Sequence, residues 1–317
     1  MKTKHVNWML LGGFIFHIVA SYGLSAYAEN HEIGTEFSML AGEIVLAIPA
    51  LILVLIDQIF LKSKEVQEEA LFSKMHYKKV KLSSYLMGIV FAYLMMPLTT
   101  VVNAISMLFV DNTIVGVSEV MLSLPFLVML TIVAVVPAFC EETICRGIVY
   151  GTYRKEGKKY VAVLVSGLMF GLMHMNFNQA LYAFVLGVAL ALLLEATGSI
   201  WTTITFHFIF NAQSCIIMYL AEKIMPGFYQ SEMATMVPDE SMYMTISIYM
   251  VIAAVCTPIG MAVLYWIAKN EGRLELLMEC IPSKKRPENG KKAIITIPLI
   301  LAIVIALGFM IMSEFFV

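Results

Sequence analysis

The chain has 317 residues, of which 60% are hydrophobic and only 14% are charged. A soluble domain is about 45–50% apolar and about 25% charged, so most of this chain's surface is unsuited to water. High hydrophobicity also excludes intrinsic disorder, and a formal net charge of -2 offers no basic excess for binding nucleic acid. The composition therefore predicts an all-α, polytopic integral membrane helical bundle.

Nine hydrophobic stretches approach the roughly 20 residues that a helix needs to cross a bilayer. The fourth is long and the fifth is short, so eight spans is the alternative count. We divide the chain into N-terminal transmembrane helices (1–120), a central core of helices (121–220) and C-terminal transmembrane helices (221–317). The predicted spans cover approximately 6–28, 39–61, 83–110, 123–150, 160–176, 178–197, 199–220, 244–268 and 293–316.

Basic residues collect in alternate connections between these spans, and such residues mark the cytoplasmic side of a membrane protein. The opposite connections are acidic and contain Lys223 as their one basic residue. We therefore expect the N-terminus in the cytoplasm and, with nine spans, the C-terminus outside. The basic residues behind this prediction are Lys2, Lys4, Lys62, Lys64, Lys74, Lys78, Lys79, Lys81, Arg154, Lys155, Lys158, Lys159, Lys269, Arg273, Lys284, Lys285, Arg286, Lys291 and Lys292.

The first stretch also has features of a secretory signal peptide. Lys2 and Lys4 precede an apolar run, and Ala26-Tyr27-Ala28 matches an A-x-A cleavage site. The apolar character continues to Ala28, which favours an uncleaved first helix. Either alternative leaves the remaining topology unchanged.

Ionisable side chains inside a span are costly, at least about 2.5–3.5 kcal/mol each, and normally face the interior of the helix bundle. Most of those in this chain fall on three parts of the predicted core. Each part carries two residues four positions apart, which places both on one helix face. The pairs are Glu142 and Arg146, Phe170 and His174, and His207 and Asn211, with Glu141 just before the first pair.

The three parts place their polar groups at comparable depths. At 1.5 Å per residue, Glu141 lies roughly 15 Å, His174 roughly 21 Å and His207 roughly 12 Å from the cytoplasmic ends of their spans. These depths agree within about two helical turns. We therefore expect one carboxylate and two imidazoles, from separate helices, to meet inside the bilayer.

This set of groups suits hydrolysis. A carboxylate in a low-dielectric site holds a proton more tightly than in water, which suits a general base. His174 can share and orient the water, while His207 and Asn211 can donate hydrogen bonds to a developing oxyanion. Glu141, His174 and His207 are also a possible zinc set of one carboxylate and two histidines. No serine-hydrolase elbow, P-loop or H-E-x-x-H motif is present.

In order along the chain, Glu141-Glu142-x-x-x-Arg146, Phe170-x-x-x-His174 and His207-x-x-x-Asn211 resemble the three motifs of the CPBP intramembrane protease family. This family is also called the CAAX protease or Abi family and includes bacteriocin-processing proteins. The resemblance covers about residues 121–220.

The resemblance implies an intramembrane endopeptidase. It makes Glu141 the catalytic glutamate that activates water with His174, and it assigns His207 and Asn211 to the oxyanion site. Glu142 and Arg146 match the rest of the first motif, where we expect a structural ion pair. A mechanism that requires no cofactor is preferred, with a zinc-dependent form of the same protease as the alternative.

The expected partners are the lipid bilayer and a membrane-associated peptide or lipidated protein substrate. Compact loops indicate a bacterial plasma membrane. Two further alternatives use the same buried polar residues without catalysis, namely a membrane transporter and an immunity protein. A transporter of that kind is typically built from two related halves, whereas the polar residues here cluster in one third of the chain.

Overall fold

A computed structural model describes residues 2–31, 35–60, 75–110, 113–227, 240–283 and 293–315. Every secondary-structure element in these ranges is a helix, which confirms the all-α prediction. Within them, seven helices are long and apolar enough to cross a membrane, and two shorter apolar segments lie at Ala47–Ile56 and Lys159–Leu172. The total of eight or nine spans is not confirmed. Several basic residues used to predict orientation fall outside the described ranges, namely Lys62, Lys64, Lys74, Lys284, Lys285, Arg286, Lys291 and Lys292.

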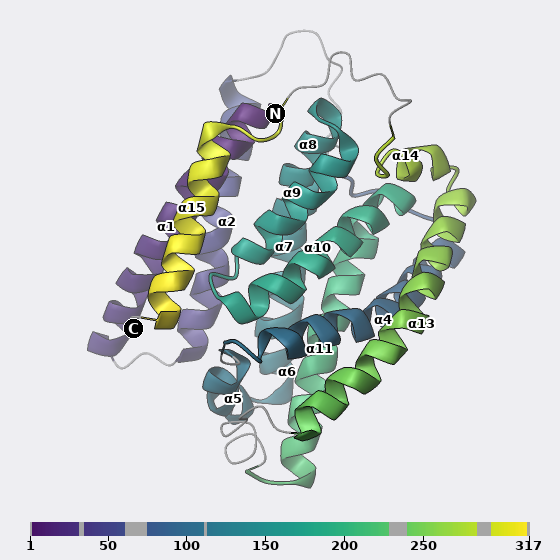
Figure 1. Ribbon diagram of the computed structural model, residues 1–317. Helices are drawn as coiled ribbons and strands as arrows, with labels where there is room; N and C mark the ends of the chain where they lie inside the picture. The colour runs from purple at the N-terminus through teal and green to yellow at the C-terminus, as the bar shows by residue number, and fades with distance from the viewer. Residues whose placement is uncertain are drawn as a thin grey trace.

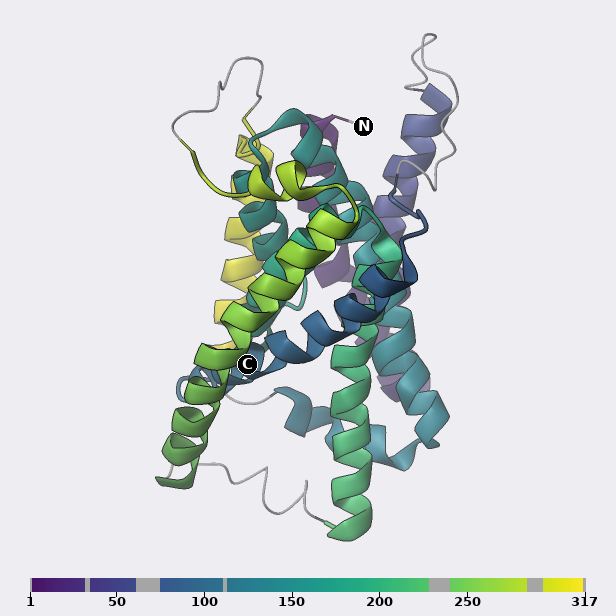
Figure 2. The same cartoon turned by 90° about the vertical axis from the view of Figure 1, so that its right-hand side faces the viewer.

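The helices form two peripheral groups around a central one (Figures 1 and 2). The first group contains α1 (Thr3–His31), α2 (Thr35–Phe60) and α15 (Ile297–Phe315), with α1 packed against both of the others. The second is the closely packed pair of α4 (Leu82–Ser106) and α13 (Glu240–Asn270). Two smaller helices, α5 (Thr113–Ser123) and α14 (Leu274–Met278), lie near the ends of these longer ones.

Two π-helical segments interrupt the first helix of the central group. It runs through α6 (Phe126–Leu130), η1 (Thr131–Val135), α7 (Val136–Glu142), η2 (Thr143–Tyr150) and α8 (Gly151–Glu156). The segments η1 and η2 are π-helical. Such wide turns are rare and occur frequently at functional sites. Here they flank α7, which carries both glutamates of the first motif.

Helices α9 (Lys159–Leu172) and α10 (Phe177–Thr197) form a hairpin. With 14 residues, α9 is only about 21 Å long, which is shorter than the roughly 30 Å hydrocarbon core. The turn that follows lies among packed helices, where its polar backbone can be satisfied. Within this turn the Asn176 side chain donates to the carbonyl of His174 (2.8 Å) and accepts from the Gln179 backbone N–H (2.8 Å).

The last helix of the central group is α11 (Ile200–Ile224), which follows α10 after a left-handed turn at Gly198 (φ 73°). The first backbone N–H of α11 donates to the carbonyl of His76 (2.9 Å). Ser199 donates its hydroxyl to the carbonyl of Lys78. The segment 75–81 before α4 therefore binds the start of α11.

The basic connections that the structure describes lie at one end of the bundle. The backbone N–H of Thr3 donates to Glu156 (2.7 Å), and the backbone N–H of Lys81 donates to Glu271 (3.1 Å). At the same end, the carboxylate of Glu195 is fully buried among four partners. Those partners are Tyr150, Arg154, Lys159 and Arg273. This arrangement agrees with the charge pattern of the sequence.

Candidate active site

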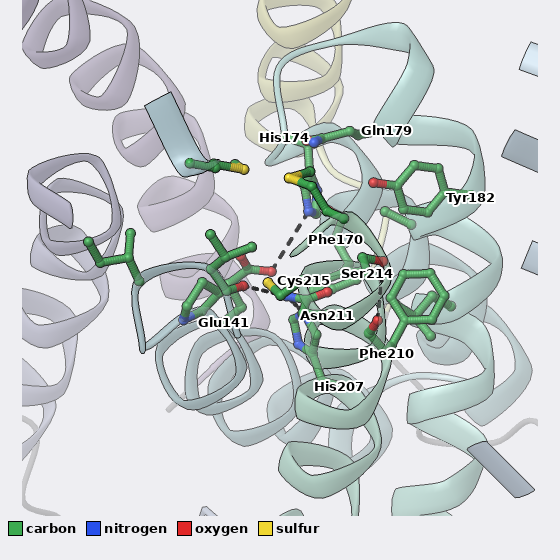
Figure 3. A pocket seen from close by; sticks show the side chains of 17 residues that line it. Glu141, Phe170, His174, Gln179, Tyr182, His207, Phe210, Asn211, Ser214 and Cys215 are labelled. Carbon is green, nitrogen blue, oxygen red and sulfur yellow. Dashed lines mark hydrogen bonds and ion pairs between the residues drawn. The ribbon is translucent and has the colours of Figure 1, made fainter. Parts of the chain in front are cut away.

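Glu141 and His174 face one another across the interior of the bundle. Glu141 lies at the end of α7, and His174 lies in the turn between α9 and α10. Their nearest atoms, Glu141 Oε2 and His174 Nε2, are 3.9 Å apart (Figure 3). Both residues are largely buried, and Glu141 Oε2 has no hydrogen-bond partner among the described residues. The structure thus brings this predicted pair together.

The backbone determines which ring nitrogen of His174 carries the proton. His174 Nδ1 lies 2.9 Å from the carbonyl oxygen of Phe170. A carbonyl only accepts, so Nδ1 is the donor and, in the neutral ring, Nε2 presents its lone pair toward Glu141. A water molecule between Glu141 and His174 would donate to both groups, leaving its oxygen lone pairs free for attack on a carbonyl.

Glu142 points to a different histidine. Glu142 Oε1 accepts from Arg146 Nη1 (2.9 Å) and lies 3.1 Å from His207 Nδ1. All three side chains are nearly inaccessible. The intrahelical pair of Glu142 and Arg146 was predicted, but its contact with His207 was not. The carboxylate therefore neutralises Arg146 and orients the His207 ring at once.

Asn211 links His207 to the backbone of the glutamate-bearing helix. Asn211 Nδ2 donates to the carbonyl of Val133 (3.0 Å) and lies 3.2 Å from His207 Nε2. In a regular α-helix that carbonyl would accept from the residue four positions later, which is Pro137 and has no N–H. Pro137 thus leaves the Val133 carbonyl without this donor, and Asn211 donates to it instead.

Phe170 separates the two histidine rings and supports both. Its ring meets His174 edge-on at a centroid distance of 5.4 Å and His207 at 5.5 Å. The guanidinium carbon of Arg146 lies 4.1 Å from the centroid of the same ring. Phe170, fully buried, thus spaces the Glu141–His174 pair from the Glu142–His207 pair.

A cavity of about 210 Å³ opens in front of these residues. Glu141, His174, His207 and Asn211 line it together with side chains that the motifs did not identify, including Gln179, Tyr182 and Phe210 (Figure 3). Gln179 and Tyr182 come from α10 and Phe210 from α11, and none of them is a named position of the three motifs quoted above. Only their placement in the folded bundle distinguishes them.

The side chains are not arranged as a zinc site. Within the described ranges, no group of three His, Cys, Asp or Glu residues is placed to hold a metal ion. Both ring nitrogens of His207 are engaged, one by Glu142 and the other by Asn211. A ligand set of Glu141, His174 and His207 would require His207 to release one of these bonds.

Comparison with known proteins agrees with this geometry. Residues 123–213 match the protein-family model described as type II CAAX prenyl endopeptidase Rce1-like. This match confirms the resemblance to the CPBP and CAAX protease family. No curated protein and no solved structure matches the chain.

The class of protein is therefore an intramembrane peptide hydrolase, with a multi-pass helical membrane architecture. Residues 123–213 are similar to the Rce1-like CAAX endopeptidases. That range includes every residue of the three motifs, among them the cavity-lining Glu141, His174, His207 and Asn211.

Proposed function

We propose that this protein is an intramembrane endopeptidase in which Glu141 and His174 activate the attacking water. The observation that carries this proposal is the pair of largely buried side chains, 3.9 Å apart, at the wall of a cavity inside the bundle. The family match to a CAAX prenyl endopeptidase supports peptide hydrolysis as the reaction.

In the proposed reaction, the water oxygen attacks the carbonyl carbon of the scissile peptide bond. Glu141 takes one proton from the water, and the carbonyl π electrons move to the oxygen to form an oxyanion. The C–N bond then breaks as its electron pair passes to nitrogen, which takes up the proton from Glu141. His174 positions the water and stabilises the charge that develops near Glu141.

His207 and Asn211 are proposed to support the oxyanion, as the family resemblance implies. Their place on the cavity wall supports this role, which requires Asn211 to exchange one of its present hydrogen bonds for one to the oxyanion. We propose a metal-free mechanism, which the engagement of both His207 nitrogens favours.

The proposed substrate is a membrane-associated peptide or a lipidated protein. The printed description of the matched family, a CAAX prenyl endopeptidase, supports a prenylated C-terminal sequence as the first probe. We place the protein in a bacterial plasma membrane with its N-terminus in the cytoplasm. The grouping of Thr3, Arg154 and Arg273 at one end of the bundle supports this orientation.

The test uses purified protein in detergent and a quenched fluorescent peptide that ends in a prenylated CAAX sequence. Glu141→Gln keeps the size of the side chain but removes its basicity. We expect Glu141→Gln to lower kcat/KM by at least about 1,000-fold, because the water then lacks its base. His174→Gln should lower it by roughly 100-fold or more, as general acid–base partners typically do.

Glu275→Gln is the matched control, since Glu275 is an exposed carboxylate on α14. It should cleave the probe at the wild-type rate. Full activity of Glu141→Gln, with wild-type folding, would refute the proposed function. Addition of a chelator to the wild-type enzyme separates the two mechanisms, because only a zinc-dependent enzyme loses activity that zinc restores.

A further inference from the structure

The proposed reaction needs hydrogen-bond donors at the oxyanion, and the resting site has few to offer. Each hydrogen of the Asn211 amide nitrogen has a partner, one at Val133 and one at His207. Because the Val133 carbonyl can only accept, the amide nitrogen must face it, and His207 Nε2 must then accept as well. In its neutral form His207 therefore has no hydrogen directed into the cavity.

Tyr182 lines the same cavity from α10. Its ring packs against Phe210 at a centroid distance of 6.0 Å, which restrains the direction of the phenol. Figure 3 shows the hydroxyl pointing into the cavity from the side opposite Glu141. No other residue in the described part of the chain forms a hydrogen bond with this hydroxyl. A half-buried donor without a partner is thus directed at the space where a substrate would lie.

We propose that Tyr182 is a further catalytic residue that donates a hydrogen bond to the oxyanion. This inference rests on the proposed function. As water adds to the carbonyl carbon, the negative charge that forms on the carbonyl oxygen accepts the phenolic O–H. No bond to Tyr182 forms or breaks, so its proton stays on the phenol while Glu141 holds the proton from the water.

Other donors near the cavity are less suited to this role. The Ser214 hydroxyl donates to the carbonyl of Phe210 within its own helix. Cys215 also lines the cavity, but a thiol is only a weak donor. A phenol is a stronger donor than an aliphatic hydroxyl, and the aromatic ring holds it in place at little entropic cost.

The experiment compares Tyr182→Phe with the wild-type enzyme on the quenched prenylated peptide. Loss of one oxyanion donor typically lowers kcat by about 100- to 1,000-fold. We expect a decrease in that range, with KM changed by less than roughly threefold, because the bond forms mainly in the transition state. Tyr219→Phe is the control, since Tyr219 on α11 packs against Phe126 of α6 and does not line the cavity.

A second measurement distinguishes catalysis from structural support. A peptide with a phosphinate in place of the scissile bond presents an anionic oxygen where the oxyanion forms. Tyr182→Phe should weaken its binding by about the same factor as it lowers kcat/KM, while the melting temperature stays unchanged. Wild-type kcat in Tyr182→Phe would overturn this inference. If Glu141→Gln is inactive in the same assay, the proposed function stands even when the role of Tyr182 fails.

Discussion

Glu141 and Glu142 are consecutive in the sequence but serve different partners. Neighbouring residues on an α-helix point about 100° apart, so the two carboxylates cannot face the same group. Glu141 faces His174 across the cavity, whereas Glu142 is hydrogen-bonded to Arg146 and His207. Two adjacent glutamates thus have separate roles: Glu141 is available as the proposed general base, and Glu142 orients His207.

The sequence was sufficient to predict which side chains gather at this site, because ionisable residues in a bilayer have few other places to go. It was not sufficient to pair them, since pairing depends on the rotation of three helices about their axes. Tyr182 could not be predicted either. A tyrosine among apolar residues is typical of any membrane helix, and only its direction in the folded bundle is informative.

His76 provides a prediction of pH dependence. It lies outside the spans, with only 9% of its surface exposed and a left-handed backbone (φ 67°). Burial, followed by the positive charges of Arg154 and Lys155, lowers the pKa of His76 from 6.5 to about 4. The folded protein therefore favours neutral His76, whereas the unfolded chain binds a proton more readily.

The stability contributed by neutral His76 is complete above pH 6.5 and falls as the pH drops toward 4. The full loss is on the order of 3 kcal/mol. His76→Asn, which tolerates the same backbone conformation, should flatten this slope in melting curves recorded between pH 8 and pH 5. The exposed control His31→Gln should keep the wild-type dependence of melting temperature on pH. If His76→Asn also keeps that dependence, the assignment to His76 is contradicted.

At the scale of helices, close packing of α9 on α10 places His174. A Cβ added at Gly187 would lie 2.8 Å from the Cα of Gly167, and one at Gly171 would lie 2.5 Å from the carbonyl oxygen of Ala180. The crossing therefore requires small residues, as in other membrane helix pairs. The hydrophobic stretches predicted two helices here, at 160–176 and 178–197, but they did not predict that α9 ends at Leu172 and leaves His174 in a turn.

Gly171→Ala should disturb this crossing, because backbone atoms cannot move aside as a flexible side chain can. We expect the variant to lose at least about 1–3 kcal/mol, as overpacked cores do, and to lose activity as His174 moves away from Glu141. Thermal unfolding in detergent and cleavage of the quenched peptide measure the two effects. Gly308→Ala on α15, where nothing lies within 4 Å of the added Cβ, should match or exceed wild-type stability.

The winding of the glutamate-bearing helix illustrates a limit of sequence reasoning at this scale. Pro137 predicts a disturbance, because the ring removes a donor from the helix. The proline does not predict that one π-helical segment precedes α7 and another follows it. Those segments depend on tertiary partners, one of which is the bond from Asn211 to Val133.

For the molecule as a whole, Glu195 links three segments at the end of the bundle that carries the basic connections. Its carboxylate is fully buried and contacts Arg154 (2.7 Å), Lys159 (3.7 Å) and Arg273 (3.6 Å). These cations come from α8, α9 and the start of α14. Charge distribution predicted that these segments share a side of the membrane, but not that one acidic residue would connect them.

Glu195→Gln should leave three cations without their shared counterion. Removing one partner of a buried ion pair typically costs about 3–5 kcal/mol, so we expect a marked drop in melting temperature. Glu279→Gln is the matched comparison, because Glu279 pairs with the same Lys159 (2.9 Å) but is 43% exposed. Exposed pairs contribute at most about 1 kcal/mol, so equal destabilisation by the two variants would contradict this account.

The contact between α1 and the segment just before α15 has a consequence for biosynthesis. The buried amide of Asn7 on α1 donates to the carbonyl of Ile294 and to the Thr296 hydroxyl, and the first of these partners lies 287 positions later in the chain. At translation rates of about 5–20 residues per second, roughly 15 to 60 s pass before those acceptors leave the ribosome. During that interval the amide must rely on water, headgroups or the insertion machinery. Completion of this helix bundle is therefore a late, post-insertion event rather than a helix-by-helix one.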